Sequence, residues 1–250
     1  MTRRRSLLAL LASLPMLGTV TFTRSIAMAD DDTDTLTTSL GELTIHPVRH
    51  ASLVLTFGDE AIYVDPVGGA ALYENLPAPT AILITHAHED HFDQFTLQAI
   101  AGSAPLIVSE QVFKRLPTAL KDNATALANG ESGEVNGIQV RAIGAYNTTE
   151  SRLRYHPQGV GNGYVITIGD RQIYVAGDTE PTPDMLGLTD IDVAFLPMNL
   201  PFTMTQEQAA EAINTFKPRV AYPYHYSEAK LDVLAAAVGA ETQLRIRNWY

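Results

Sequence analysis

Short apolar runs separated by turn signals open the folded part of the chain. Residues 43–48, 51–57 and 61–64 are rich in β-branched and aliphatic side chains, and Gly58-Asp59 separates the last two runs. Runs of this length with a tight turn between them are typical of antiparallel strands rather than helices. The pattern therefore predicts a β-meander that begins near residue 40.

The pattern then changes to alternating strands and helices. A continuous apolar run at 81–85 predicts a buried strand, and the spacing of apolar residues in 92–101 predicts a helix after it. Asn136-Gly137 between two β-forming runs is a strong hairpin signal. Thr205 with Gln208 forms a capping box, which is typical of a helix start. The remaining expected elements are strands at 106–108, 131–135, 138–143 and 219–222, a helix at 205–216, and a helix at 228–238 capped by Ser227.

An internal repeat relates the two halves of the chain. Residues 56–64 align without gaps on residues 167–175, with Thr, Gly, Asp, Ile, Tyr and Val identical at an offset of 111. Duplication would explain the repeat, and independent origin of a common Gly-Asp hairpin is the alternative. Two related halves predict an α/β fold in which two mixed sheets face each other under outer helices, with a site at their shared rim.

The first 29 residues have the pattern of a secretory signal peptide. Arginines at 3–5 precede an apolar run from 7 to 22, and Ala27-Met28-Ala29 has the small residues of a cleavage site. Paired arginines favour the twin-arginine route, and general secretory export is the alternative. Pro15 and Gly18 interrupt the run, which argues against a membrane anchor. We expect a periplasmic or secreted protein with no stable anchor after cleavage.

Charge and composition narrow the classes of function. The chain has 250 residues, no cysteine, and 28 acidic against 17 basic side chains, for a formal net charge of −11. Removal of residues 1–29, which contain four arginines and no acid, would leave −15. Such a charge argues against binding nucleic acid, and the lack of cysteine excludes disulfides and thiolate metal sites. We expect a disordered acidic leader at 30–39 and one domain at 40–250, whose oligomeric state the sequence leaves open.

Potential metal ligands are concentrated directly after the buried strand 81–85. Residues 85–91 read Thr-His-Ala-His-Glu-Asp-His. Alternate side chains of an extended segment share one side, so His86, His88 and Asp90 would converge, with His91 following at the turn. Imidazole and carboxylate are the donors that Zn²⁺ takes, and burying this group without a metal or water would be costly. A hydrated polar loop is the alternative.

This run is the H-x-H-x-D-H signature, and the chain resembles the metallo-β-lactamase fold superfamily over its whole length after the expected signal peptide. The other marks of that family fall on Asp65, His156, Asp178 and His225. The resemblance implies an αβ/βα four-layer sandwich, in which two facing mixed β-sheets carry helices on their outer sides. It also implies a metal-dependent hydrolase.

The resemblance further implies a pair of divalent metal ions. The implied ligands are His86, His88 and His156 for one ion, Asp90, His91 and His225 for the second, and Asp178 as a bridge, with Asp65 supporting them from behind. Zn²⁺ is the expected metal, and Mn²⁺ and Fe are alternatives. Two such cations would generate a bridging hydroxide as nucleophile, which Asp90 or Asp178 would orient as the catalytic carboxylates.

Four short motifs resemble one branch of the superfamily. They are His50-Ala51-Ser52, Tyr63-Val64-Asp65-Pro66, Gly161-Asn162-Gly163-Tyr164 and Pro197-Met198-Asn199. They are similar to those of ascorbate-6-phosphate lactonase-like proteins and phospholipase D-type phosphodiesterases. This branch implies cleavage of a lactone or a phosphodiester in a small-molecule substrate. The alternatives are an oxidoreductase or sulfur-transfer member of the fold, and a periplasmic metal-binding module without catalysis.

The aperiodic segment 144–162 around His156 is where we expect contacts with substrate. The expected residues are Tyr146, Asn147, Arg152 and Arg154. The two arginines are among the few cations of an acidic protein and could bind a carboxylate or phosphate, although a solvated loop would look the same. His46 is expected to be a surface or packing residue, and His50 is left without a role.

Overall fold

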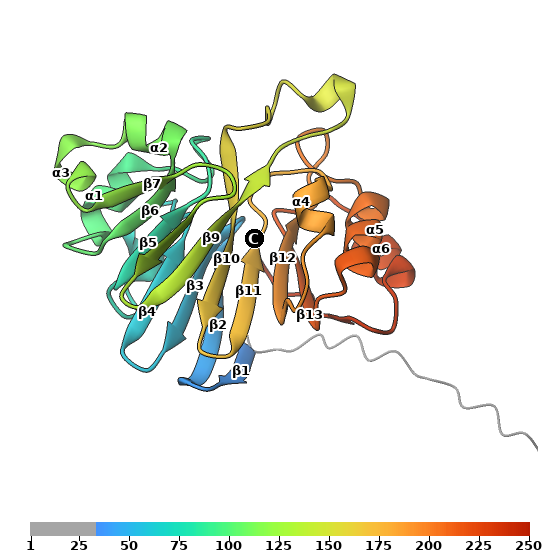
Figure 1. Cartoon of the computed structure of the whole chain (residues 1–250), viewed down its shortest axis with the longest axis horizontal. Coiled ribbons are helices and arrows are strands. Elements are labelled where there is room, and N and C mark those ends of the chain that lie inside the picture. Colours follow the sequence, from blue (N-terminus) through green and yellow to red (C-terminus); the bar gives the residue numbers. More distant parts are fainter. Residues whose placement is uncertain (1–33) are drawn as a thin grey trace, which may run out of the picture.

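Residues 34–250 are described by a computed structural model and lie in two seven-stranded mixed β-sheets (Figure 1). The expected signal peptide at 1–29 falls outside this range. In spatial order the first sheet holds β1 (Asp34–Thr38), β2 (Gly41–Arg49), β3 (Ser52–Phe57), β4 (Glu60–Val64), β5 (Ala81–Ile84), β6 (Leu106–Ser109) and β7 (Ala124–Leu127). The second holds β14 (Gln243–Leu244), β13 (Val220–Tyr224), β12 (Val193–Pro197), β11 (Arg171–Val175), β10 (Gly161–Ile168), β9 (Ile138–Ala145) and β8 (Ser132–Val135).

The two sheets are built to the same plan. Strands β1 to β4 pair antiparallel and β4 to β7 pair parallel, and β8 to β11 and β11 to β14 repeat this sequence of pairings. The repeated residues form the equivalent hairpins β3–β4 and β10–β11, where Gly58 and Gly169 have φ of 54° and 60°. Glycine adopts this left-handed conformation without a steric penalty. The repeat in the sequence therefore corresponds to a repeat in the topology.

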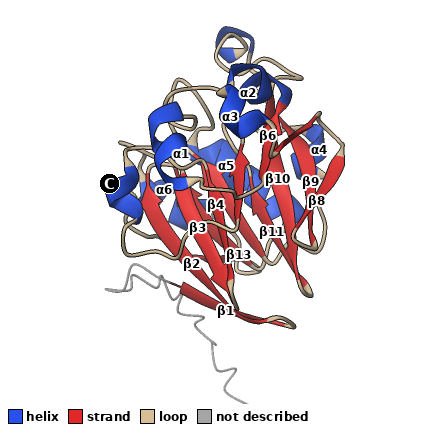
Figure 2. Cartoon of the chain, turned by 90° about the vertical axis from the view of Figure 1, so that its left-hand side faces the viewer, coloured by secondary structure: helices blue, strands red, loops and turns tan. Residues whose placement is uncertain are grey.

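Helices cover the outer face of each sheet (Figures 1 and 2). Those on the first sheet are α1 (Gln94–Ile100), α2 (Glu110–Arg115) and α3 (Thr118–Lys121), and those on the second are α4 (Pro183–Leu186), α5 (Gln206–Phe216) and α6 (Leu231–Ala237). Short 3₁₀ turns occur at Ala70–Tyr73 and Glu150–Arg152. The expected four-layer arrangement, two facing mixed sheets with helices on their outer sides, is confirmed.

Alternating side chains of the strands supply three apolar layers. On β3, Leu53 and Leu55 belong to the cluster between the two sheets, whereas Val54 belongs to the cluster beneath the helices of the first sheet. Strands covered on both faces read as continuous apolar runs, which is why 81–85 carries no polar residue before its last position. Among residues 34–250, no helix has the length and apolar character to cross a membrane.

Two expected elements differ from the structure. Part of the expected disordered leader is ordered, since Asp34–Thr38 form β1. The reason is a long-range contact: Asp34 accepts hydrogen bonds from Tyr222 and Arg247, at 2.6 and 2.7 Å. The helix expected at 228–238 begins at Leu231 without a side-chain cap, and Ser227 has φ of 42° with its backbone nitrogen donating to the Tyr250 hydroxyl.

Candidate metal centre

The ligand-type residues gather at one rim of the two sheets because they follow strand ends. Asp65 follows β4, the 86–91 segment follows β5, Asp178 follows β11 and His225 follows β13, and each of these strands belongs to a parallel pair. The carboxyl ends of parallel strands lie at the same edge of a sheet. His156 reaches this edge on the long loop between β9 and β10.

One cluster joins His86, His88, His156 and Asp178, each of which offers a donor atom within 4.8 Å of the others. His86 Nε2 lies 3.0 Å from His88 Nδ1, and His156 Nε2 lies 3.2 Å from both His88 Nδ1 and Asp178 Oδ2. His156 Nδ1 donates to the Phe202 carbonyl at 3.0 Å, which leaves the lone pair of Nε2 facing the cluster.

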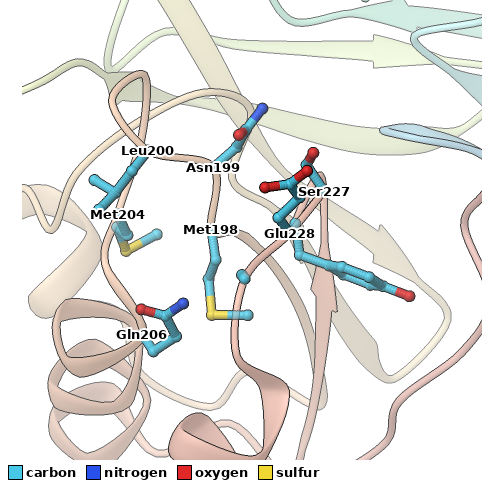
Figure 3. Close-up of a pocket in the computed structure, with 9 residues that line it drawn as sticks. Met198, Asn199, Leu200, Met204, Gln206, Ser227 and Glu228 are labelled. Carbon is cyan, nitrogen blue, oxygen red and sulfur yellow. The ribbon is translucent and has the colours of Figure 1, made fainter.

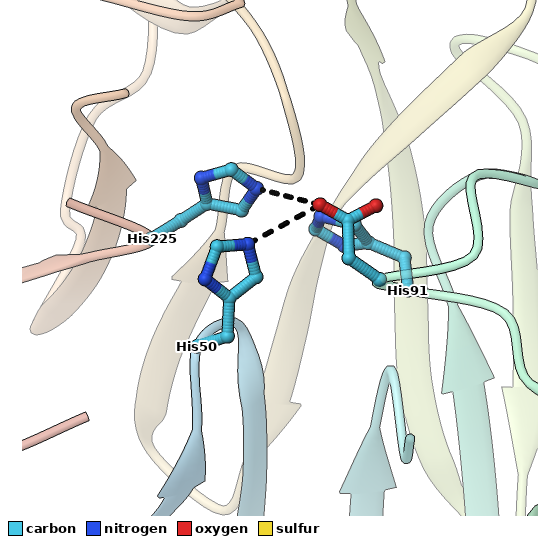
Figure 4. A group of neighbouring side chains, drawn as sticks. His50, His91 and His225 are labelled. Atoms are coloured by element: carbon cyan, nitrogen blue, oxygen red, sulfur yellow. Dashed lines mark hydrogen bonds and ion pairs between the residues drawn. The ribbon is translucent and has the colours of Figure 1, made fainter. Parts of the chain in front are cut away.

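A second cluster joins His50, Asp90, His91 and His225 (Figure 4). His225 Nε2 lies 3.4 Å from Asp90 Oδ2 and 3.3 Å from Asp178 Oδ2. His91 Nε2 lies 3.2 Å from Asp178 Oδ1. The carboxylate of Asp178 therefore faces both clusters.

The donor set fits divalent cations. Donors about 2.0–2.2 Å from a cation lie about 3.0–3.5 Å from each other, and most of the spacings above fall in that range. Among the described residues, several buried polar atoms of the rim have no hydrogen-bond partner: His91 Nε2, Asp178 Oδ1, and His225 Nδ1 and Nε2. Buried polar atoms without partners are rare in folded proteins, and ligation would satisfy those that face the clusters.

Asp65 lies behind the donors and fixes one of them. Its carboxylate is fully buried and accepts hydrogen bonds from the Thr85 backbone at 2.7 Å, the Thr85 hydroxyl at 2.6 Å and His91 Nδ1 at 2.7 Å. With Nδ1 protonated, His91 presents Nε2 to the cluster. Asp65 is therefore placed to orient a ligand rather than to serve as one.

Charges within the metal-free centre shift the pKa values of its members. Burial opposes the charged form of His91, but the carboxylates of Asp178 and Asp65 outweigh it and hold the pKa of His91 well above its ordinary value. Burial of Asp178 is likewise outweighed by His225 and His91, so the pKa of that carboxyl lies well below its ordinary value. Burial, reinforced by His91, holds the pKa of His86 well below the ordinary value. The 3.2 Å approach of His91 Nε2 to Asp178 Oδ1 contributes to the first two of these shifts.

Only one of the four expected substrate contacts lines the cavity at this centre. The cavity has a volume of about 330 Å³. Its lining residues are His88, Asp90, Arg154, Tyr155, His156, Asp178, Asn199, Phe202 and His225. Arg154 lies over the Tyr155 ring, with its guanidinium carbon 4.8 Å from the ring centre. Tyr155 in turn packs edge-on against Phe202 at 5.0 Å.

Arg152, Asn147 and Tyr146, the other expected substrate contacts, bond to other residues of the protein. Arg152 forms a 2.7 Å ion pair with the buried Glu180, and Asn147 donates to the Phe202 carbonyl at 2.7 Å. Tyr146 is not among the residues that line this cavity, and its backbone nitrogen donates to the Thr179 hydroxyl at 3.0 Å. Through these bonds the three residues help to hold the loop in place.

A neighbouring hollow of about 280 Å³ lies beside the centre, between the loops that follow β12 and β13 (Figure 3). Met198, Met204 and Gln206 line one side, and Ser227 and Glu228 line the other. Asn199 lines both this hollow and the cavity at the metal centre.

His50 is the residue of the centre that the sequence did not assign. It sits in the turn between β2 and β3 with φ of 56°. Because β2, β3 and β4 are successively antiparallel, this turn and the end of β4 must lie at the same edge of the sheet. The predicted meander thus contained the signal that places His50 near Asp65.

Comparisons with known proteins agree with this geometry. The model of the family described as "Beta-lactamase superfamily domain" matches residues 44–225. UPF0173 metal-dependent hydrolases of Pyrococcus horikoshii and Thermococcus onnurineus are 31% and 33% identical over 189 residues, which is 71% of this chain and 82% of each relative.

Solved structures give the same result. A protein from Parabacteroides distasonis described as a metal-dependent hydrolase is 39% identical, with a TM-score of 0.79, and the match covers 86% of this chain and 97% of that one. The metallo-β-lactamase fold protein YhfI from Bacillus subtilis, at 16% identity and a TM-score of 0.64 over 80% of this chain and 89% of that one, shares the fold. The chain therefore belongs to the metallo-β-lactamase superfamily and, within it, to the UPF0173 family of metal-dependent hydrolases.

Proposed function

We propose that this hydrolase works with two metal ions and cleaves an ester-like bond, either a lactone or a phosphodiester, in a small anionic substrate. The observation that carries the proposal is the position of Asp178, whose two oxygens face His91 on one side and His156 on the other, each at 3.2 Å. A single carboxylate that faces two clusters can hold two cations close together, as two-metal hydrolysis needs.

The two clusters would divide the ligands between the ions. His86, His88, His156 and Asp178 would hold one, and Asp90, His91, His225 and Asp178 the other. When bound, such cations supply Lewis acidity toward the carbonyl or phosphoryl oxygen and make water nucleophilic near neutral pH. The histidine-rich donor set favours Zn²⁺.

A carboxylate of the chain would accept a hydrogen bond from the attacking water. Asp90 is exposed over 49% of its side chain and lines the cavity, so it can accept a hydrogen bond from water there. Asp178 is 3% exposed and is held by the histidines around it. Asp90 is therefore the carboxylate placed to orient the nucleophile.

The residues that line the cavity support the proposal that the substrate is anionic. Within residues 34–250, Arg154 is the only arginine or lysine among the lining residues, and it has no carboxylate partner there. A guanidinium can bind carboxylate or phosphate in a bidentate manner. Tyr155 and Phe202 add an aromatic edge next to it.

Residues 1–29 support a further proposal, that the enzyme acts outside the cytoplasm. Their basic start, apolar run and small-residue end have the pattern of a signal peptide, and the paired arginines favour the twin-arginine route. We infer a periplasmic or secreted location.

The deciding experiment joins elemental analysis of the purified protein to a panel of lactones, phosphodiesters, thioesters and β-lactams. We expect two divalent ions per chain and turnover confined to lactones or to phosphodiesters. One ion per chain, or turnover confined to thioesters or β-lactams, would contradict the proposal.

A further inference from the structure

We propose that His50 is a fifth protein donor to the second metal site, so that the two sites have unequal numbers of ligands. The inference rests on the proposed two-metal centre and goes beyond it, since His50 lies outside the H-x-H-x-D-H signature and its associated ligands. Its side chain joins Asp90, His91 and His225 in a group whose donor atoms all lie within 4.8 Å (Figure 4).

The imidazole of His50 occupies a position like that of the other donors in the second cluster. His50 Nε2 lies 3.2 Å from Asp90 Oδ2, and His225 Nε2 lies 3.4 Å from the same oxygen. Both imidazoles point their Nε2 atoms at one place, and their ring centres are 3.8 Å apart. The spacing between His50 and Asp90 equals that between other donors of the centre, about the edge of a coordination polyhedron.

The other ring nitrogen of His50, Nδ1, faces the Tyr250 hydroxyl. His50 Nδ1 lies 2.9 Å from the Tyr250 hydroxyl, and that oxygen also accepts a hydrogen bond from the Ser227 backbone nitrogen at 2.8 Å. A phenol oxygen can accept a second hydrogen bond, from Nδ1 of His50. Nε2 then carries a lone pair toward the cluster, as in His91 and His156, whose Nδ1 atoms are likewise bound to acceptors.

The backbone of His50 is held in an unusual conformation by two hydrogen bonds. His50 has φ of 56°, a strained conformation that non-glycine residues rarely adopt. Its nitrogen donates to the Trp249 carbonyl at 2.8 Å, and its carbonyl accepts from the His225 nitrogen at 2.9 Å. The turn is therefore tied directly to a ligand on the other sheet, which fixes both imidazoles together.

The consequence is a difference between the two sites. The second site would have His50, Asp90, His91, His225 and Asp178, whereas the first has one donor fewer. A site with five protein donors exceeds the tetrahedral set that structural Zn²⁺ prefers and accommodates ions of higher coordination number. We expect the second site to be the one at which ions other than Zn²⁺ compete.

Cobalt substitution tests the assignment without relying on turnover, because Co²⁺ absorbs visible light with an intensity that falls as its coordination number rises. The metal-free protein is titrated with Co²⁺ as wild type, as His50→Ala and as His46→Ala. His46 is a matched control on β2, where its Nε2 lies 2.9 Å from the Thr56 hydroxyl. Circular dichroism of each variant checks folding.

In His50→Ala we expect the second Co²⁺ to bind roughly 100-fold more weakly, with a more intense visible band, and imidazole in solution to restore the wild-type spectrum. Tyr250→Phe, which keeps the ring of His50, should weaken the second site by about 10-fold. His46→Ala should match the wild type. If His50→Ala fails to fold, Tyr250→Phe carries the test through its second-site affinity.

Two Co²⁺ ions in wild type, with affinity and spectrum unchanged in both His50→Ala and Tyr250→Phe, would overturn the inference alone. Weaker binding in His50→Ala without any spectral change or imidazole rescue would also overturn it, because it would show that His50 supports the site without ligating. Fewer than two Co²⁺ ions in wild type would contradict the proposed two-metal function itself.

Discussion

Three residues of the metal centre have left-handed backbone conformations. His50, Asp65 and His225 have φ of 56°, 46° and 47°. Each such residue costs on the order of 1–3 kcal/mol and persists only where surrounding bonds determine it. The nitrogens of all three donate to backbone carbonyls, those of Trp249, Leu83 and His50, respectively. The side chains are thereby set before any ion binds.

Asp178→Ala is the substitution that most directly tests the shared carboxylate. The change removes a donor from both clusters, so we expect the metal content to fall from two ions to one and turnover to fall by several orders of magnitude. Asp65→Asn, which alters only the support of His91, should cost about 10–100-fold. Elemental analysis and hydrolysis rates of the purified variants measure both effects.

The matched control for that test is Asp59→Asn, in the exposed β3–β4 turn at the opposite edge of the sheet. It should leave metal content and rate unchanged. Retention of two ions and of a near-normal rate in Asp178→Ala would contradict the assignment of this residue as a bridge.

The raised pKa of His91 predicts that metal binding releases a proton. In the metal-free protein His91 is protonated at neutral pH because Asp178 and Asp65 outweigh burial, and a cation can bind Nε2 only after that proton leaves. Affinity should therefore fall as the pH falls. Calorimetric titration at pH 7 in buffers of different ionisation enthalpy should give about one proton released from this residue.

Asp65→Asn provides the internal check on this reading. Loss of one of the two carboxylates that raise the pKa of His91 should reduce the number of protons released at pH 7. An unchanged proton count in that variant would assign the released proton to another group.

At the residue scale, the gathering of ligand-type residues at one rim could be predicted, because the signature has four His or Asp residues in six positions and Asp65, Asp178 and His225 follow strand ends. Residue type alone did not assign a role to His50, whereas its place beside Asp65 follows from the antiparallel pairing of β2, β3 and β4, which the predicted meander already implied. The contacts of Arg152 with Glu180 and of Asn147 with the Phe202 carbonyl could not be predicted for a related reason, because these partners are distant in sequence.

At the scale of elements, the long β9–β10 loop is held by a buried polar network. Glu180 is fully buried and accepts hydrogen bonds from the Thr148 and Thr149 backbone nitrogens, the Thr149 hydroxyl and Gln208, in addition to its ion pair with Arg152. Gln208 also belongs to the capping box that begins α5. The loop that carries His156 is therefore anchored to the first turn of α5, which covers the second sheet.

Arg152→Met should destabilise the protein strongly. The substitution leaves the buried carboxylate of Glu180 without its cation, and breaking a buried pair in this way costs about 3–5 kcal/mol. Chemical denaturation followed by circular dichroism measures the change in the free energy of unfolding. A change below about 0.5 kcal/mol would show that the other hydrogen bonds of Glu180 suffice.

Arg154→Met, two residues away, should leave the free energy of unfolding almost unchanged. Its guanidinium is exposed and rests on the Tyr155 ring, so the free energy of unfolding should change by less than about 0.5 kcal/mol. KM for an anionic substrate should rise, with a smaller effect on an uncharged one. An equal rise in KM for both substrates would contradict the proposed contact between Arg154 and a substrate anion.

Local pattern predicted most elements but not those set by distant partners. The capping box at Thr205 and the Asn136-Gly137 turn are local, and both occur as expected. The order of β1 depends instead on Asp34 meeting residues more than 180 positions away, and Ser227 bonds through its backbone to Tyr250. No periodicity within those segments records such contacts.

At the scale of the whole molecule, the expected export can be tested with two substitutions. Arg4→Lys combined with Arg5→Lys keeps the charge of the amino-terminal segment and removes the paired arginines that the twin-arginine route reads. We expect the uncleaved precursor to stay in the cytoplasm, as measured by fractionation and immunoblotting. Unimpaired export of this variant, with Arg24→Lys as the control, would favour the general secretory route.

The two sheets meet at the metal centre, so metal removal should weaken their association. His86, His88, Asp90 and His91 come from the first sheet, and His156, Asp178 and His225 come from the second, so bound ions would cross-link the halves. Chelation would remove those links and leave only the apolar layer between the sheets and their hydrogen bonds.

The expected result of exhaustive chelation is a lower melting temperature as well as loss of turnover. An ion present at 100 times its dissociation constant stabilises the folded state by about 2.7 kcal/mol, which corresponds to about 5–10 °C in a chain of this size. Calorimetry with and without chelator measures the shift, and readdition of Zn²⁺ should reverse it. Asp178→Ala should show a smaller shift because it binds one ion fewer. An unchanged melting temperature in the wild type would mean that the two halves hold together without the ions, so that the centre serves chemistry alone.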